Sequence, residues 1–192
     1  MRKIILFLLF ALVGCAAIPP KNSDNICSTF REKYDWYGNA STAYQKWGVP
    51  IPVLMAIMHQ ESHFVADAKP PRTWLLGMIP WFRPSSAYGY AQALDTTWDD
   101  YLDSAGRWGA DRDEFADAAD FIGWYNYLSN KRLGIAKTDA KNLYLAYHEG
   151  HNGYRKKRYL HKKWLMQSAA TVAKRAALFH NQLAACQLAD KR

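Results

Sequence analysis

The stretch MHQESHF, residues 58–64, contains side chains that could carry out chemistry. His59 and His63 are four residues apart, and Glu61 lies between them. Each residue of a helix turns by about 100°, so the two histidines share one face and the glutamate lies on the opposite face. The histidines could bind a metal ion, whereas the glutamate could act as an acid.

The face that carries Glu61 is otherwise apolar. The residues at helical spacing from it are Leu54, Ile57, Met58, Phe64 and Val65. Desolvation there favours the protonated acid, and a carboxyl group that stays neutral near neutral pH suits the general acid of glycosidic cleavage. The alternative is a buried glutamate that a tyrosine or an arginine satisfies, in a chain with 12 tyrosines.

Zinc is the second chemical interpretation. His59 and His63 have the spacing of two ligands, and His148 or His151 could supply a third. In the zinc-protease motif, however, the glutamate directly follows the first histidine, and here Gln60 intervenes. The H-x-E of zinc deaminases is present without the P-C-x-x-C that completes it. We therefore expect no metal and no cofactor.

Helices must position these residues, because the hydrophobic periodicity is helical almost throughout. We expect helices over residues 24–47, from about 51 through the MHQESHF stretch, 96–104, 113–132, 138–147 and 159–188, with stops at Gly106, Gly134 and Gly150. Residues 67–92 contain four prolines and should form a long irregular loop or a small hairpin region. The sequence thus predicts a mainly α, single-domain fold.

The irregular segment also carries three aromatic side chains for which the sequence allows two roles. Trp74, Trp81 and Phe82 could wall a groove that binds glycan, since aromatic faces pack well on sugar rings. They could equally fill the core.

The chain opens with MRKIILFLLFALVGC, in which basic residues precede an apolar run that ends at Cys15. The run is shorter than the roughly 20 residues of a membrane span, and its order is that of an export signal. LVGC resembles the lipobox of bacterial lipoproteins, which implies a membrane anchor through lipidated Cys15. Ala16 after it favours the outer membrane, facing the periplasm, over the inner membrane. The implied parts are a signal peptide (1–14), a lipidated tether (15–23) and a domain (24–190). An ordinary cleaved signal that contains a cysteine is the alternative.

Two further cysteines, Cys27 and Cys186, lie on apolar helical stripes. An oxidising compartment permits a disulfide between them, which would join the two ends of the domain if the first and last helices pack together. A pair of buried free thiols is the other interpretation.

The composition is that of a folded globule, 49% hydrophobic and 15% aromatic, which excludes a disordered spacer. A net charge of +8 suits an anionic partner such as cell wall or lipid headgroups. The densest basic patch, YRKKRYLHKKW at residues 154–164, could suggest nucleic acid, but export argues against it and favours a solvated helix face. We expect a monomer that binds no nucleic acid.

Three motifs together resemble a known family. ESHF (61–64), AYGYAQ (87–92) and AYHEG (146–150) occur in the order and approximate spacing of the soluble-type lytic transglycosylases, relatives of goose-type lysozyme. The resemblance implies a lysozyme-like domain that acts on peptidoglycan strands. It further implies cleavage between N-acetylmuramic acid and N-acetylglucosamine without water, with 1,6-anhydro ends and Glu61 as the single acid and base.

The resemblance also implies roles for the neighbours of Glu61. Ser62 matches a position that contacts substrate or holds the glutamate, although it could be a small packed residue. Tyr147 matches the tyrosine that positions the glutamate and the muramic sugar, although it could be a core aromatic.

A second set of implied substrate-binding residues follows the G-x-x-Q pattern. Gly89 lets the backbone approach the sugar, and the amide of Gln92 binds it. The family usually has Gly-Leu-Met-Gln and Ala-Tyr-Asn where this chain has GYAQ and AYH. Tyr90 and His148 therefore alter the subsites.

Two other functions remain open. A muramidase would hydrolyse the same bond with a second carboxylate, Glu149 or Asp67. Only Glu61 lies on an apolar helical face, however, and we expect the other acids to cap helices or face solvent. The third function is that of a non-catalytic, peptidoglycan-binding lipoprotein.

Overall fold

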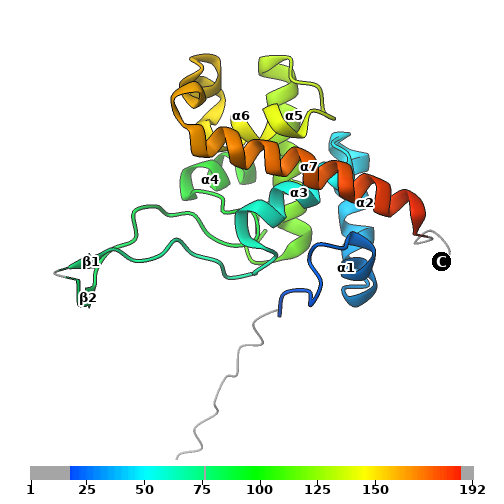
Figure 1. The fold of residues 1–192 in the computed structure, drawn as a ribbon, viewed down its shortest axis with the longest axis horizontal. Coiled ribbons are helices and arrows are strands. Elements are labelled where there is room, and N and C mark those ends of the chain that lie inside the picture. Colours follow the sequence, from blue (N-terminus) through cyan, green and yellow to red (C-terminus); the bar gives the residue numbers. More distant parts are fainter. Residues whose placement is uncertain (1–17, 76, 187–192) are drawn as a thin grey trace, which may run out of the picture.

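The computed structural model describes residues 18–75 and 77–186, and this part of the chain is mainly helical, as predicted (Figure 1). Its helices are α1 (Ile26–Glu32), α2 (Trp36–Trp47), α3 (Ile51–Ser62), α4 (Asp95–Ala105), α5 (Phe115–Leu133), α6 (Ala140–Arg155) and α7 (Lys163–Ala185), with a 3₁₀ turn η1 at Arg158–His161. None of these helices combines the length and hydropathy that crossing a membrane requires. The predicted signal and Cys15 lie outside the described residues.

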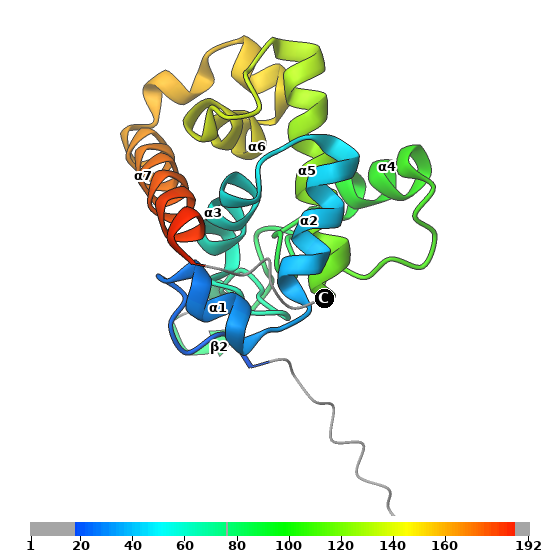
Figure 2. The ribbon, with the colours of Figure 1, turned by 90° about the vertical axis from the view of Figure 1, so that its right-hand side faces the viewer.

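Helix α3 lies in the middle of the helical body and contacts α2, α5, α6 and α7 (Figure 2). Every side chain from Val53 to Met58 is at most 4% exposed. A helix that is hydrophobic all round must be buried on all sides. The last turn of α3 consequently brings Glu61 to the centre of the molecule.

The first predicted helix is in fact two helices. Helix α1 ends at Glu32 and α2 begins at Trp36, where the sequence predicted one helix over residues 24–47. Helix α1 packs against α7, whereas α2 packs mainly against α5. One straight helix could not follow both partners, so the backbone turns between them, next to the exposed Tyr34.

A disulfide bond joins Cys27 of α1 to Cys186, directly after α7. The two Cα atoms are 6.2 Å apart, and the free-thiol alternative is not what the structure contains. The backbone N–H of Ile26 also donates to the side-chain oxygen of Gln182 at 2.9 Å. The two ends of the described domain are thus held together.

The C-terminal helices differ from their predicted bounds. The predicted stop at Gly150 is a break within α6: Gly150 is non-helical, with φ 71° and ψ 157°, and a second helical stretch continues from it to Arg155. Helix α7 begins at Lys163 rather than near residue 159, because η1 occupies the intervening turn. Helices α4 and α5 lie within two residues of their predicted bounds.

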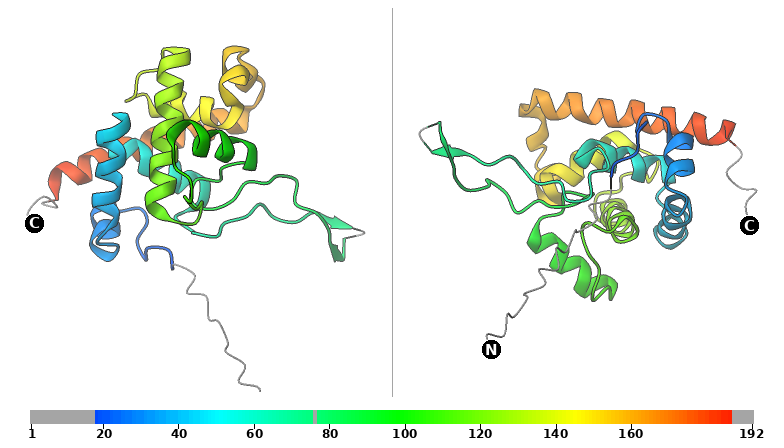
Figure 3. Two further views of the ribbon diagram at one scale, coloured as in Figure 1. Left: turned by 180° about the vertical axis from the view of Figure 1, so that it is seen from behind. Right: turned by 90° about the horizontal axis from the view of Figure 1, so that it is seen from below.

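Residues 67–92 form the predicted irregular segment with a small hairpin. Strands β1 (Trp74–Leu75) and β2 (Ile79–Pro80) pair antiparallel, with Trp74 opposite Pro80. Figures 1 and 3 show this hairpin projecting away from the helical body. The segment then returns to the body and makes a tight turn between Tyr88 and Ala93, which pair in an isolated bridge.

Candidate active site

Glu61 lies in the last turn of α3 and is partly buried. Burial raises the pKa of its carboxyl group from 4.5 to about 7, and a hydrogen bond from the Tyr144 hydroxyl opposes part of this rise. The free carbonyls at the C-terminal end of a helix also disfavour a negative charge in its last turn. Glu61 therefore holds its proton in the pH range where a general acid must hold it.

Two tyrosines of α6 lie beside the Glu61 carboxyl group. Tyr144 and Tyr147 are three residues apart, so they share a face of the helix, and the charge of Glu61 contributes to raising the pKa of both hydroxyls. Tyr147 is the tyrosine that the sequence predicted, whereas Tyr144 was missed. Its helical spacing from Tyr147 is the signal that could have identified it.

Tyr147 also connects the second and third motifs. Its hydroxyl donates to the backbone oxygen of Ala91 at 2.6 Å. The three motifs that are separate in the sequence therefore meet around Glu61.

The turn at Gly89 and Gln92 is held by its own backbone contacts. Gly89 has φ +79°, and a Cβ there would lie 2.0 Å from the backbone oxygen of Arg112. The side-chain amide of Gln92 donates to the backbone oxygens of Ala68 and Gly89, both at 2.9 Å. In this structure the glycine serves close packing and the amide holds the turn; their contacts with a sugar remain predictions.

Two residues predicted to contact substrate lie in the core instead. Tyr90 is 2% exposed and packs edge-on against Trp36 and Phe115. Ser62 is 6% exposed, and its hydroxyl donates to the Met58 backbone oxygen at 3.2 Å. Both side chains are thus buried, and the roles of Tyr90 toward substrate and of Ser62 toward substrate or Glu61 stay predictions.

A cavity of about 230 Å³ adjoins the tyrosine face of α6. Three predicted residues, Gln92, Tyr147 and His148, line it together with Glu149. Glu61 is not among the lining residues. A larger cavity of about 770 Å³ shares Tyr125 with the first, so the two are neighbours. A polymeric ligand could extend from one cavity into the other.

Glu149 is not the solvated or capping acid that we expected. Its side chain is 3% exposed and pairs with Lys162, at 2.6 Å between Oε1 and Nζ. The His148 ring lies 3.7 Å from the same carboxylate. Lysine neutralises the buried charge and explains how α6 tolerates it. Asp67, the other candidate second carboxylate, is exposed, as expected.

The four histidines of the zinc interpretation do not gather at one place. His59 and His63 contact each other, with ring centroids 4.7 Å apart, but His148 packs against Trp164 and His151 stacks on a tyrosine. Burial lowers the pKa of His59 to about 4. Within residues 18–75 and 77–186, no three His, Cys, Asp or Glu side chains are grouped to hold a metal ion.

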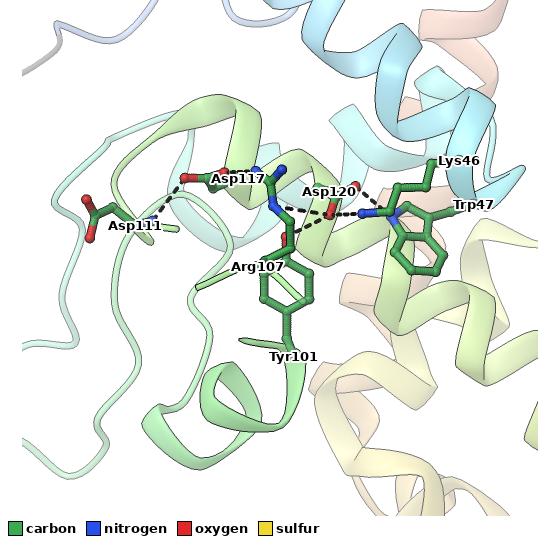
Figure 4. Close-up of polar contacts among 7 residues, drawn as sticks. All are labelled: Lys46, Trp47, Tyr101, Arg107, Asp111, Asp117 and Asp120. Carbon is green, nitrogen blue, oxygen red and sulfur yellow. Dashed lines mark hydrogen bonds and ion pairs between the residues drawn. The ribbon is translucent and has the colours of Figure 1, made fainter. Parts of the chain in front are cut away.

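Asp120 of α5 is a second buried carboxylate, and the sequence reasoning missed it. It is 5% exposed and accepts hydrogen bonds from Lys46 at 2.9 Å, Trp47 at 2.7 Å and Tyr101 at 2.7 Å (Figure 4). Asp117 lies one turn before it in the helix, so the apolar face that marked Glu61 is absent around Asp120. A lysine and two neutral donors satisfy Asp120, whereas the described residues provide no ion pair for Glu61.

The aromatic residues of the hairpin do not fill the core. Trp74 is 62% exposed, Trp81 52% and Phe82 59%. The core alternative is therefore wrong. None of the three lines the two neighbouring cavities beside α6, so the groove alternative gains no support from the structure.

Comparison with known proteins agrees with this arrangement. The family model described as the transglycosylase SLT domain matches residues 3–186. No curated protein and no solved structure gives a significant match. Since the match covers nearly the whole chain, this protein belongs to the transglycosylase SLT domain family of peptidoglycan lytic transglycosylases.

Proposed function

We propose that Glu61 is the single acid and base of a lytic transglycosylase that forms 1,6-anhydro products. The observation that carries this proposal is one partly buried carboxyl group with a pKa of about 7, where the three motifs meet and no cation of the described chain neutralises it. Asp120, the comparable carboxylate of α5, is fully engaged by its donors.

The proposed reaction needs two proton transfers at the same carboxyl group. Protonated Glu61 donates its proton to the glycosidic oxygen as the bond from C1 of N-acetylmuramic acid to that oxygen breaks. The resulting carboxylate accepts the proton of the muramic 6-hydroxyl while O6 bonds to C1. The proton count balances, and no water is consumed. Both transfers are efficient because the pKa lies near neutrality.

Mass spectrometry of the products released from purified peptidoglycan tests this mechanism. We expect muropeptides lighter by one water than their reducing counterparts, and their loss in Glu61→Gln. Glu114→Gln is the matched control, because Glu114 is exposed at the start of α5 and makes no capping hydrogen bond. Retained glycan binding without any products from the wild-type protein would instead favour the non-catalytic function.

Hydrolysis is the second candidate, because Glu149 lines the cavity beside Tyr147. Its carboxylate pairs with Lys162, and a second carboxylate beside the cavity is the group that would activate water in a hydrolase. Reducing-end products that disappear in Glu149→Gln would establish this function. Anhydro products that persist in Glu149→Gln would exclude it.

We also propose that lipidated Cys15 anchors the protein to the outer membrane, facing the periplasm. The support is the LVGC sequence and the small residue after it. Cys15→Ala should move the protein from the membrane fraction to the soluble fraction or leave an uncleaved precursor. Unchanged fractionation and an unchanged mass would contradict the anchor.

A further inference from the structure

The hairpin of residues 72–83 presents an apolar tip to solvent. Trp74, Met78, Trp81 and Phe82 are 62%, 78%, 52% and 59% exposed. Contiguous exposed apolar side chains of this size mark interaction surfaces. The described part of the chain leaves these four side chains largely uncovered.

Defined backbone contacts hold the tip in place. The Thr73 N–H donates to the Phe82 oxygen at 2.9 Å, and the Trp81 N–H donates to the Thr73 oxygen at 2.7 Å. The Arg72 side chain donates to the Trp81 oxygen at 3.1 Å, and that of Arg83 donates across the two arms to Pro70. The hairpin is therefore a formed element whose base carries cations.

The segment that forms this base carries only cations, and Asp95 lines the same hollow from the start of α4. Residues 68–94 contain Lys69, Arg72 and Arg83 and no aspartate or glutamate. The three cations line a hollow of about 430 Å³ together with Arg112. Arg112 forms an ion pair with Asp95, at 2.7 Å between its guanidinium nitrogen and the Asp95 Oδ1. Lys69, Arg72 and Arg83 make no ion pair within the part of the chain that the structure describes. Arg72 and Arg83 each donate to a backbone oxygen, but no carboxylate of the described residues neutralises the three cations, which keep donors for an anionic partner.

We propose that this hairpin docks into the surface of an anionic phospholipid bilayer. Tryptophan prefers the boundary between headgroups and acyl chains, and an adjacent basic cluster is attracted to anionic lipid. The tip enters the interface while Lys69, Arg72 and Arg83 bind lipid phosphates. Docking holds the domain close to the membrane in one orientation and does not depend on the catalytic mechanism.

Glycan is the less suitable partner for the tip. Its exposed aromatic residues do not line the cavities beside Tyr147, and the hairpin points away from the helical body (Figure 3). Charge does not separate the two partners, because cell wall is anionic as well as lipid headgroups; the position of the tip does. A bilayer offers both an apolar region for the tip and anionic phosphates for the cations next to it.

Partition into vesicles tests the proposal on the chain without residues 1–14 and with Cys15→Ser. This form keeps every described core residue, since these lie between Ile26 and Phe179. The protein should sediment with vesicles of phosphatidylethanolamine and phosphatidylglycerol. Binding should be weaker to vesicles of phosphatidylcholine alone, and weaker at high salt. Arg72→Gln with Arg83→Gln should weaken partition about fivefold per cation. Trp74→Ser with Trp81→Ser should weaken it about tenfold or more.

The matched control removes two exposed cations from the basic patch at residues 154–164, as Lys156→Gln with Lys163→Gln. It should change partition much less than the hairpin variants do. Equal losses in both charge variants would mean whole-surface electrostatics and would overturn the hairpin as the docking element. Unchanged partition with lost glycan binding in the tryptophan variant would assign the tip to the glycan instead. Thermal unfolding checks that all variants are folded.

Discussion

The raised pKa of Glu61 predicts that this residue destabilises the fold as the pH rises. The folded protein holds the proton up to about pH 7, whereas the unfolded chain releases it near 4.5. Between these values the folded state binds more protons, so the free energy of unfolding falls with rising pH. A pKa change from 4.5 to about 7 corresponds to roughly 3 kcal/mol. Most of this loss is complete by about pH 8.

Glu61→Gln removes the titrating proton and keeps the shape of the side chain. The variant should match the wild-type protein near pH 4.5 and exceed its stability by about 3 kcal/mol near pH 8. Urea unfolding followed by circular dichroism at several pH values measures the difference. His59 and His151 also titrate, since burial lowers the pKa of each to about 4, but they contribute equally to both proteins. Their effect cancels in the difference curve.

Glu114→Gln is the control for a general effect of removing a carboxylate. Glu114 is exposed, so this variant reports what removing a negative charge does without removing a desolvated carboxyl group. A flat curve for Glu61→Gln would refute the argument from desolvation and with it the reason for choosing Glu61 as the acid. If the stability advantage of Glu61→Gln over wild type appears only above about pH 9, folding opposes the ionisation of Glu61 more strongly than argued here.

Three further predictions concern stability. Cys27→Ala with Cys186→Ala should lower the free energy of unfolding by up to about 5 kcal/mol, the loop-entropy limit for a separation of 159 residues. Calorimetry of the wild-type protein should show a similar loss when reductant is added. Gly89→Ala should cost at least about 2 kcal/mol and reduce activity, because the new Cβ meets the backbone of Arg112; wild-type unfolding midpoints would contradict the clash. Asp120→Ala should cost about 3 kcal/mol in urea unfolding, since Lys46, Trp47 and Tyr101 lose their acceptor, and a loss below about 1 kcal/mol would contradict this.

The elements that carry a strong local signal were predicted well from the sequence. Helices α4 and α5 have regular apolar periods and glycine stops, and residues 67–92 are marked by proline. The apolar face around Glu61 in the sequence predicted the desolvation of its carboxyl group. These predictions depend on neighbours within one or two helical turns.

The features that the sequence did not reveal depend on packing between distant segments. The break after α1 is set by α7 and α5, and nothing local marks it. The ion pair of Glu149 depends on Lys162 across η1, and the core position of Tyr90 depends on Trp36 and Phe115. Motif matching gave each residue a role by position in the sequence, whereas burial decides which side chains a substrate can reach.

The disulfide can form only late in the synthesis of the chain. Synthesis proceeds from the N-terminus, so Cys27 emerges when almost all of the domain is still to be made, and Cys186 follows 159 residues later. The bond therefore cannot guide the early helices to their places. It locks a domain whose other helices have already been made, and until then the Cys27 thiol waits without its partner Cys186.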